Sequence, residues 1–304
     1  MLGLGVRAAN GALEILDLPD PREPQDGELA LDMVAAGIGP WDPLLHSGGW
    51  DVDLAPPAAL GVEGVGRVSA VGPGESHFEV GELVLVHEAP LPGGSGTWAE
   101  KVLVRSASAA HAPENLTPAL AAALPVAGLT AEQALDDLQV TAGTRLLVVG
   151  ASGPTASLAV QLAKRRGAEV VAGAGPAHAE RLRALGADKV IDTHVAGWAD
   201  REDRRFDAAL IAASGTSQDA IGLVVDGGRL TSITLDAPET ERDITSVDLY
   251  VQPDAGALRR LAELAATGEL VMDVESTPIR EGIDVADRVG EGRSGGVKHV
   301  LGIR

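Results

Sequence analysis

The feature that most constrains the fold of this chain is an apolar run that passes directly into a glycine-rich turn. Residues 144–149 (TRLLVV) have the pattern of a strand buried on both faces, and residues 150–156 (GASGPTA) follow immediately. A stretch with helical periodicity continues to residue 167. A strand, a glycine turn and a helix in this order predict a βαβ unit of a parallel sheet.

The turn has the composition of a binding site for the pyrophosphate of a dinucleotide. Gly150 permits the tight turn, Gly153 lets the backbone approach the phosphates, and Ala156 is small enough for close packing of helix on strand. The N–H groups at the start of the helix present a partial positive charge, and Pro154 is tolerated there. A strand–turn–helix without a ligand is the alternative interpretation.

The end of the second strand favours NADPH. A site that prefers NAD usually has Asp or Glu there, which accepts a hydrogen bond from the ribose 2′-hydroxyl. Here residues 171–175 (VAGAG) contain no acid, so the strand end can accommodate a 2′-phosphate. His178 and Arg181 in the following helix are the nearest candidate partners of that phosphate, and either is equally a solvated surface residue.

Short strands dominate the first third of the chain. Residues 28–38, 63–72 and 82–87 predict strands of a compact antiparallel barrel or sandwich. A helical stretch begins at residue 117, and Pro125 divides it into two short helices.

Strands and helices then alternate from residue 144 to 251, the pattern of a doubly wound parallel sheet. The tail contains one amphipathic helix, 256–268, and one apolar strand, 297–303. We expect this tail to pack back on the β-rich head.

Composition excludes several kinds of site. The 304 residues include no cysteine, which removes disulfides, thiolate nucleophiles and cysteine-ligated metals. The net charge of −20 opposes contact with phosphate backbones and anionic membranes. The sequence shows neither a targeting signal nor a membrane span. We therefore expect a cytoplasmic protein with no nucleic-acid or membrane partner.

These motifs together resemble the medium-chain dehydrogenase/reductase superfamily, in the branch of zinc-independent quinone oxidoreductases and enone reductases. The resemblance implies a GroES-like β-barrel catalytic domain (1–118 and 252–304), a Rossmann cofactor domain (119–251) and a homodimer. Tyr250 is expected on the last strand of the cofactor domain, which pairs across the dimer in relatives. The segments that carry the resemblance are 35–48, 60–84, 123–135, 146–171, 185–192, 227–233 and 250–270.

The resemblance implies a site without a metal. Zinc-dependent relatives have a Cys in a Cys-x-x-Asp segment and a His in a Gly-His-Glu segment, where this chain has Gly39 and Val62. With these ligands missing, no metal is expected. The expected activity is hydride transfer from NADPH to an acceptor that is already polarised, a quinone or an α,β-unsaturated carbonyl compound (enone).

The chain departs from the family at positions that would identify the substrate. Gly39 replaces an asparagine beside the nicotinamide, and Leu44 and His46 replace a lysine and an arginine. Trp50 stands where enoyl reductases often have a tyrosine acid, and Ala212 where relatives often have an acidic residue.

Four residues near this segment are candidates for the chemistry. His46 is the predicted proton donor, although a surface or packing role is the simpler interpretation. Asp42 is either an acid/base or a local structural anchor. Trp41 and Trp50 either line the acceptor pocket or pack the loop.

The remaining candidates bind the cofactor. Pro40 and Thr130 match positions near the cofactor in relatives, and other candidates lie at carboxyl ends of strands, where ligands bind in such sheets. The predicted cofactor site consists of Pro40, Thr130, Gly150, Ala151, Ser152, Gly153, Pro154, Thr155, Gly173, Ala174, His178, Arg181, Ser214, Gly215, Ile233 and Thr234.

Two other functions remain open at this point. One is a polyketide-tailoring enoyl or keto reductase, which shares the machinery and differs in pocket size. The other is an NADP(H)-binding redox sensor with little turnover, which the lost asparagine, acid and tyrosine favour.

Overall fold

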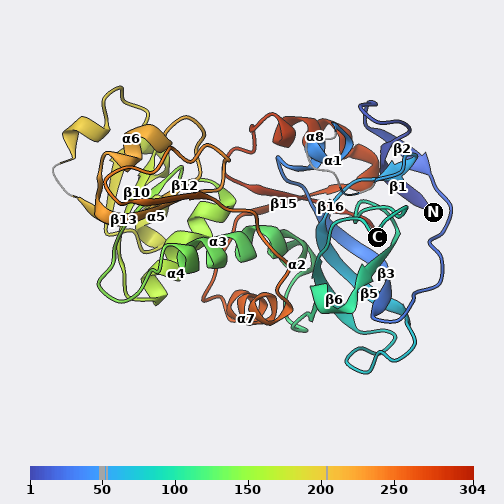
Figure 1. Cartoon of the computed structure of the whole chain (residues 1–304). Coiled ribbons are helices and arrows are strands. Elements are labelled where there is room, and N and C mark those ends of the chain that lie inside the picture. Colours follow the sequence, from blue (N-terminus) through green and yellow to red (C-terminus); the bar gives the residue numbers. More distant parts are fainter. Residues whose placement is uncertain (48–51, 53, 203–204) are drawn as a thin grey trace. The chain divides into compact units, whose positions relative to one another are not determined.

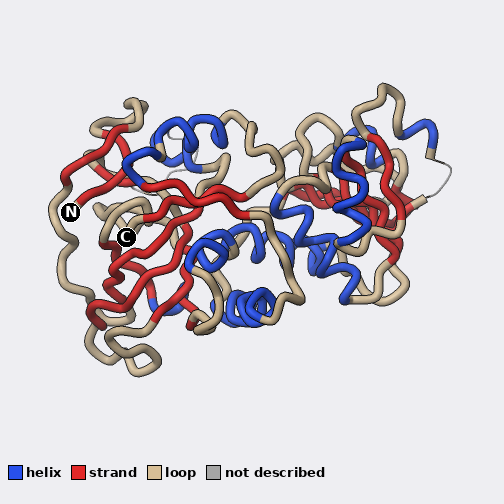
Figure 2. Tube along the Cα trace, turned by 180° about the vertical axis from the view of Figure 1, so that it is seen from behind, coloured by secondary structure: helices blue, strands red, loops and turns tan. Residues whose placement is uncertain are grey.

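A computed structural model describes residues 1–47, 52, 54–202 and 205–304 (Figures 1 and 2). Its contacts divide the chain into two compact units. The first unit consists of Met1–Val126 and Pro253–Arg304, and the second of Ala127–Gln252.

The first unit contains the β-rich GroES-like domain. Its larger sheet has the strand order β15-β16-β3-β5-β6-β8, with β7 also paired to β3. A smaller sheet has the order β2-β1-β4. Along β3 every second side chain from Leu29 to Ala35 is buried, so one face covers the core. The strands are β1 Leu2–Val6, β2 Glu14–Asp17, β3 Glu28–Gly37, β4 Ala58–Ala59, β5 Glu63–Val71, β6 Leu83–His87, β7 Lys101–Arg105, β8 Ala109–His111, β15 Val274–Pro278 and β16 Lys298–Gly302.

The tail is richer than the sequence predicted. Besides α7 (Ala255–Ala266), which Asp254 caps by accepting from the Ala257 N–H at 2.9 Å, it contains β15 and the helix α8 (Ile283–Gly290). The prediction of one helix and one strand was therefore wrong. Acidic residues of β15 and α8 interrupt the apolar pattern of these elements, which hid both of them.

The second unit contains the Rossmann sheet. Six parallel strands have the order β11-β10-β9-β12-β13-β14, so the strand order reverses between β9 and β12. This confirms the doubly wound prediction, and ligands bind at such a switch point, beyond the carboxyl ends of the strands. The strands are β9 Arg145–Val149, β10 Glu169–Ala174, β11 Lys189–Asp192, β12 Phe206–Ile211, β13 Val224–Ser232 and β14 Thr245–Asp248.

Helices join these strands. Pro125 divides the helical stretch as predicted, because α2 (Pro118–Ala123) ends before it and α3 (Pro125–Asp137) begins with it. The others in this region are α4 Pro154–Arg165, α5 Ala179–Ala184 and α6 Ser217–Ile221. Tyr250 lies beyond the end of β14 and is 67% exposed, so its placement on the last strand was wrong. No helix in the described ranges is both long and apolar enough to cross a bilayer.

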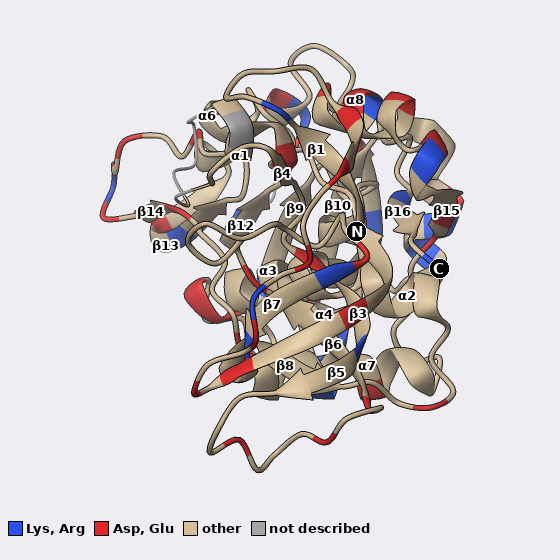
Figure 3. Cartoon of the chain, turned by 90° about the vertical axis from the view of Figure 1, so that its right-hand side faces the viewer, with Lys and Arg blue, Asp and Glu red and all other residues tan. Residues whose placement is uncertain are grey.

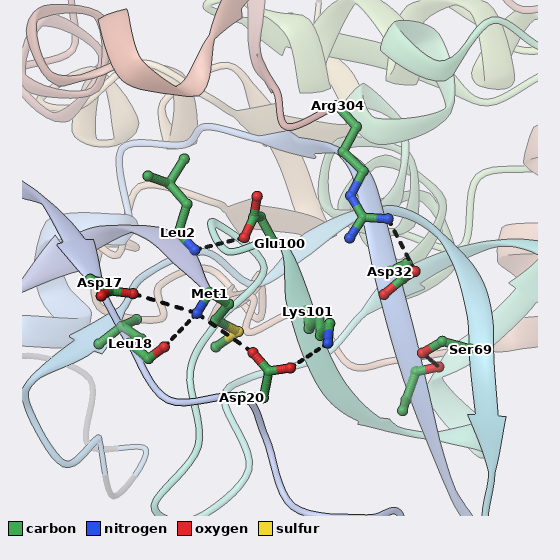
Figure 4. Close-up of polar contacts among 11 residues, drawn as sticks. Met1, Leu2, Asp17, Leu18, Asp20, Asp32, Ser69, Glu100, Lys101 and Arg304 are labelled. Atoms are coloured by element: carbon green, nitrogen blue, oxygen red, sulfur yellow. Dashed lines mark hydrogen bonds and ion pairs between the residues drawn. The ribbon is translucent and has the colours of Figure 1, made fainter.

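Charged residues do not gather into one stripe in the view of Figure 3, where acidic positions are scattered over loops, strands and helices. Polar contacts also fasten the chain ends to the first unit (Figure 4). The Leu2 N–H donates to Glu100 at 2.7 Å, and Arg304 pairs with Asp32 at 3.0 Å. A cavity of about 340 Å³ beside Lys101 is lined by none of the predicted site residues, so we do not assign the chemistry to it.

Candidate active site

The glycine turn of the second unit is fastened to two neighbouring strands. The N–H groups of Gly150 and Ala151 donate to the Gly173 carbonyl at 2.9 and 3.0 Å, at the end of β10. Gly150 has a φ of +78°, and a Cβ there would lie 2.7 Å from the backbone of Ala212. Only glycine fits this position, because the backbone after β12 fills the space.

The start of α4 has the features of an anion site. Gly153 is its N-cap residue, Pro154 begins the helix, and no side chain among the described residues caps its N–H groups. A Cβ on Gly153 would meet only the Gly150 carbonyl oxygen, at 3.5 Å. The uncapped N–H groups and the room around Gly153 suit a pyrophosphate.

The end of β10 is enclosed by the segment that follows β11. A Cβ on Gly173 would lie 2.6 Å from the Thr193 side chain, and one on Gly175 would lie 2.8 Å from the His194 ring. Sequence reasoning missed Thr193 and His194. Because β10 and β11 are parallel neighbours, residues following one strand lie beside the end of the other, and this rule could have found them.

The two residues predicted to read a 2′-phosphate follow β10. His178 ends the short 3-10 turn Pro176–His178, and Arg181 lies in the first turn of α5. Both residues are half-buried.

Asp236, which sequence reasoning also missed, joins the loops after β12 and β13. Its carboxylate accepts from the Gly215 N–H at 2.7 Å and from the hydroxyls of Thr234 and Ser232, each at 2.8 Å. Burial alone would raise the pKa of Asp236, but these hydrogen bonds outweigh it and lower the pKa. Asp236 therefore holds Gly215 and Thr234 together at the carboxyl ends of β12 and β13. Both residues are predicted to contact the cofactor.

The first unit has a tight turn after β3. Asp42, 1% exposed, accepts from the Gly39 N–H at 2.7 Å, and its other oxygen has no partner among the described residues. A Cβ on Gly39 would lie 2.1 Å from the Trp41 ring. The indole thus occupies the space that a side chain at position 39 would need.

Burial raises the pKa of Asp42 to about 8. The Gly39 N–H and the Lys298 ammonium oppose the rise, and the Glu63 carboxyl adds to it. A fully buried acid that binds a backbone N–H of its own turn has the geometry of a structural anchor rather than of a group that meets substrate.

The raised pKa of Asp42 predicts how the unfolding free energy depends on pH. The folded chain keeps this proton up to about pH 8, whereas the unfolded chain loses it near pH 3.8, so Asp42 lowers the unfolding free energy as pH rises from 4 to 8. Asp42→Asn keeps an oxygen for the Gly39 N–H but has no carboxyl to titrate. Its unfolding free energy should therefore rise relative to that of wild type by a few kcal/mol between pH 4 and pH 8. Urea midpoints measured from pH 4 to 9 test this, and a difference that does not change with pH contradicts it.

Two buried charges lie beneath this turn. Lys298, 3% exposed, donates to Oε1 of Glu63 at 2.5 Å, and Glu63, 0% exposed, also accepts from the Val126 N–H at 2.8 Å. Burial raises the pKa of Glu63, while Lys298 and Val126 oppose the rise. His87 pairs with Glu63 in the β5–β6 register, and burial lowers its pKa to about 4. Sequence reasoning missed all three, because residues so far apart in the chain carry no local pattern.

The other predicted residues are placed as follows. Pro40 is exposed in the turn after β3, and Thr130 is 9% exposed in α3. His46 lies in α1 (Asp42–Ser47), but its side chain, like all of Trp50, falls outside the described residues.

The residues at the positions where zinc-dependent relatives have their ligands do not fit a metal. Gly39 offers no ligand and no room for one, and the neighbouring candidate Val62 is apolar and 1% exposed. Within the part of the chain that the structure describes, no three His, Cys, Asp or Glu residues are grouped so that they could hold a metal ion.

Known proteins are similar to this chain in sequence and in fold. Residues 25–114 match the alcohol dehydrogenase GroES-like domain. The quinone oxidoreductase of Coxiella burnetii superposes with a TM-score of 0.89, at 23% identity, over 100% of this chain and 99% of that one.

Two curated relatives are more similar in sequence. The pikromycin polyketide synthase component PikAII of Streptomyces venezuelae is 38% identical over 68% of this chain and 5% of its own length. The chloroplastic NADPH-dependent alkenal/one oxidoreductase of Arabidopsis thaliana is 31% identical over 70% of this chain and 56% of its own. The chain thus spans a small part of the first relative and just over half of the second.

Proposed function

We propose that this chain, a member of the medium-chain dehydrogenase/reductase superfamily in its quinone oxidoreductase-like branch, is an NADPH-dependent, zinc-independent reductase of quinones or enones. The observation that carries the proposal is the uncapped start of α4 behind the glycine turn. The start of α4 can bind the phosphates of a dinucleotide, and the family consists of oxidoreductases that use one.

The proposed cofactor supplies the hydride, and the chain supplies its binding and orientation. The N–H groups after Gly153 would bind the pyrophosphate, and the end of β10 at Gly173 and Ala174, with Thr193 and His194 beside it, would contact the adenosine ribose. The loops that Asp236 holds together would bind the nicotinamide end. The absence of an acid at the end of β10 supports a 2′-phosphate, as does the Arabidopsis relative, whose name records NADPH dependence.

Gly39, Val62 and Trp41 support the zinc-independent part of the proposal. Neither Gly39 nor Val62 is a ligand, and the Trp41 ring fills the space of a side chain at position 39. An acceptor polarised by its own conjugation needs no Lewis acid, which favours a quinone or an enone over an alcohol.

The reduced acceptor needs a proton, for which we propose His46 as the donor. An imidazole can give a proton to an enolate or hydroquinone anion near neutral pH. We propose Trp41 and Trp50 as walls of the acceptor pocket. The burial of Asp42 supports its assignment as an anchor of the turn.

A second candidate is a reductase of polyketide-like enoyl or keto groups. The 38% identity to part of the pikromycin synthase component favours it. It would use the same residues for the cofactor and would differ in the size of the acceptor.

We also propose a homodimer that acts in the cytoplasm. β14 ends the six-stranded sheet, and the exposed Tyr250 follows it, so this edge supports pairing with a second copy.

The test is a cofactor titration followed by an acceptor panel. Tryptophan fluorescence quenching should give a lower Kd for NADPH than for NADH, and NADPH oxidation should follow with a quinone, an enone or an enoyl thioester. Tighter binding of NADH would contradict the 2′-phosphate argument. Oxidation with only the enoyl thioester would favour the second candidate, and binding without turnover on any acceptor would favour a redox sensor.

A further inference from the structure

Lys298 is a buried cation for which the proposed reaction has no use. The antiparallel register that pairs Val300 with Gly37 brings Lys298 alongside the turn that follows β3. Its ammonium donates to the Ile38 carbonyl at 2.9 Å and lies 4.8 Å from the centre of the Trp41 ring. Lys298 therefore contacts both the residue before the turn and the aromatic side chain within it.

Glu63 holds the ammonium in this place. One carboxylate oxygen accepts from Lys298 at 2.5 Å, and the other accepts from the Val126 N–H in the first turn of α3. Glu63 is 0% exposed and Lys298 is 3% exposed, so neither charge can exchange its partner for water. The pair therefore fixes the ammonium relative to the end of β3.

The ammonium acts on the turn by contact rather than through a long-range field. The adjacent Glu63 carboxylate cancels most of its charge at greater distances. A cation over the face of an indole is attracted to the ring, and more strongly where water is excluded. The Trp41 Nε1–H has no hydrogen-bond partner among the described residues, whereas the ring lies 4.8 Å from the Lys298 ammonium. Among the described residues, the contact with Lys298 is therefore the polar interaction that orients the ring.

We propose that Lys298 is a positioning residue that holds the Trp41 indole as a rigid wall of the acceptor site and so makes the site selective for flat conjugated acceptors. The inference rests on the proposed function, because it takes Trp41 to meet the acceptor. An indole that is already fixed stacks on a planar quinone without losing mobility on binding. Bulky saturated acceptors gain no such stacking.

The test removes both charges together, because removing one would leave the other buried and unpaired. In Glu63→Gln/Lys298→Met the glutamine still accepts from the Val126 N–H, and the methionine keeps the apolar stem. We expect acrylamide quenching of Trp41, taken as the difference from the same protein with Trp41→Leu, to rise about twofold or more. The KM for a naphthoquinone should rise about tenfold and the Kd for NADPH should change by less than about twofold.

Two controls separate positioning from a general structural role. Lys298→Arg keeps a cation over the ring and a pair with Glu63, and should restore near wild-type values. In a Trp41→Leu background the double substitution should not raise the KM further.

Three results would overturn the proposal. The double variant could leave the quenching of Trp41 unchanged, or raise the Kd for NADPH as much as the KM for the naphthoquinone. It could also raise that KM as much in the Trp41→Leu background as in wild type. If wild type binds NADPH but reduces no acceptor, the proposed function fails together with the acceptor role of Trp41. The quenching measurement would still decide whether Lys298 fixes the indole.

Discussion

Gly153→Asp is expected to raise the Kd for NADPH by about 100-fold or more while leaving the protein at least as stable as wild type. A carboxylate at this position would lie where the pyrophosphate binds. Two unit charges about 4 Å apart near a protein surface repel by about 4 kcal/mol, enough for more than 100-fold in affinity. The side chain has room, because a Cβ there meets only the Gly150 carbonyl oxygen at 3.5 Å.

The same substitution should stabilise α4. Gly153 is the N-cap residue, and an aspartate there accepts from first-turn N–H groups and interacts well with the helix dipole. Thermal unfolding and NADPH titration of one preparation measure both effects. Gly153→Asn is the matched control, since it has the same size without the charge and should bind NADPH more tightly than the aspartate variant. A Kd within about threefold of wild type for Gly153→Asp would contradict the phosphate site.

Glu63→Ala is expected to cost about 3–5 kcal/mol of unfolding free energy. It would leave the Lys298 ammonium buried without a carboxylate and the Val126 N–H without an acceptor. The mechanism is an uncompensated buried charge rather than a lost contact, because both partners are almost fully buried.

The control is Glu63→Gln/Lys298→Met, which removes both charges at similar volume and should lose much less. Urea unfolding in a Trp198→Phe background measures this, since the other three tryptophans precede Ala127, where the second unit begins. If the alanine variant were as stable as the double variant, the buried pair would carry no such energy.

The Rossmann sheet could be predicted from the sequence because its evidence is local. A strand buried on both faces, a positive-φ glycine and a helix start occur in one run of residues, so the order of residues alone specifies the turn at Gly150. The division of the helical stretch at Pro125 is local in the same way. Local signals also explain the miss at α8 and β15, whose acidic residues break the expected apolar pattern.

The candidate site depends on contacts between distant residues, and these carry no sequence pattern. Glu63 and Lys298 are 235 residues apart, and Asp236 reaches back 21 residues to Gly215. From the sequence, Gly39 is a departure from the family and Trp41 is separately a residue that lines the acceptor pocket or packs the loop. Only the structure shows that they are one feature, in which the ring takes the space of the missing side chain.

The most direct test of the central claim follows deuterium from the cofactor to the acceptor. The protein is treated with a chelator and mixed with an enone and NADPH that carries deuterium on either face of C4. We predict oxidation of one NADPH per saturated ketone formed, with deuterium from one of the two labelled cofactors at the β-carbon of the product, and no loss of rate after chelation. NADPH binding without label in any product would contradict enone reduction, and a rate that returns only when zinc is added would contradict the zinc-independent mechanism.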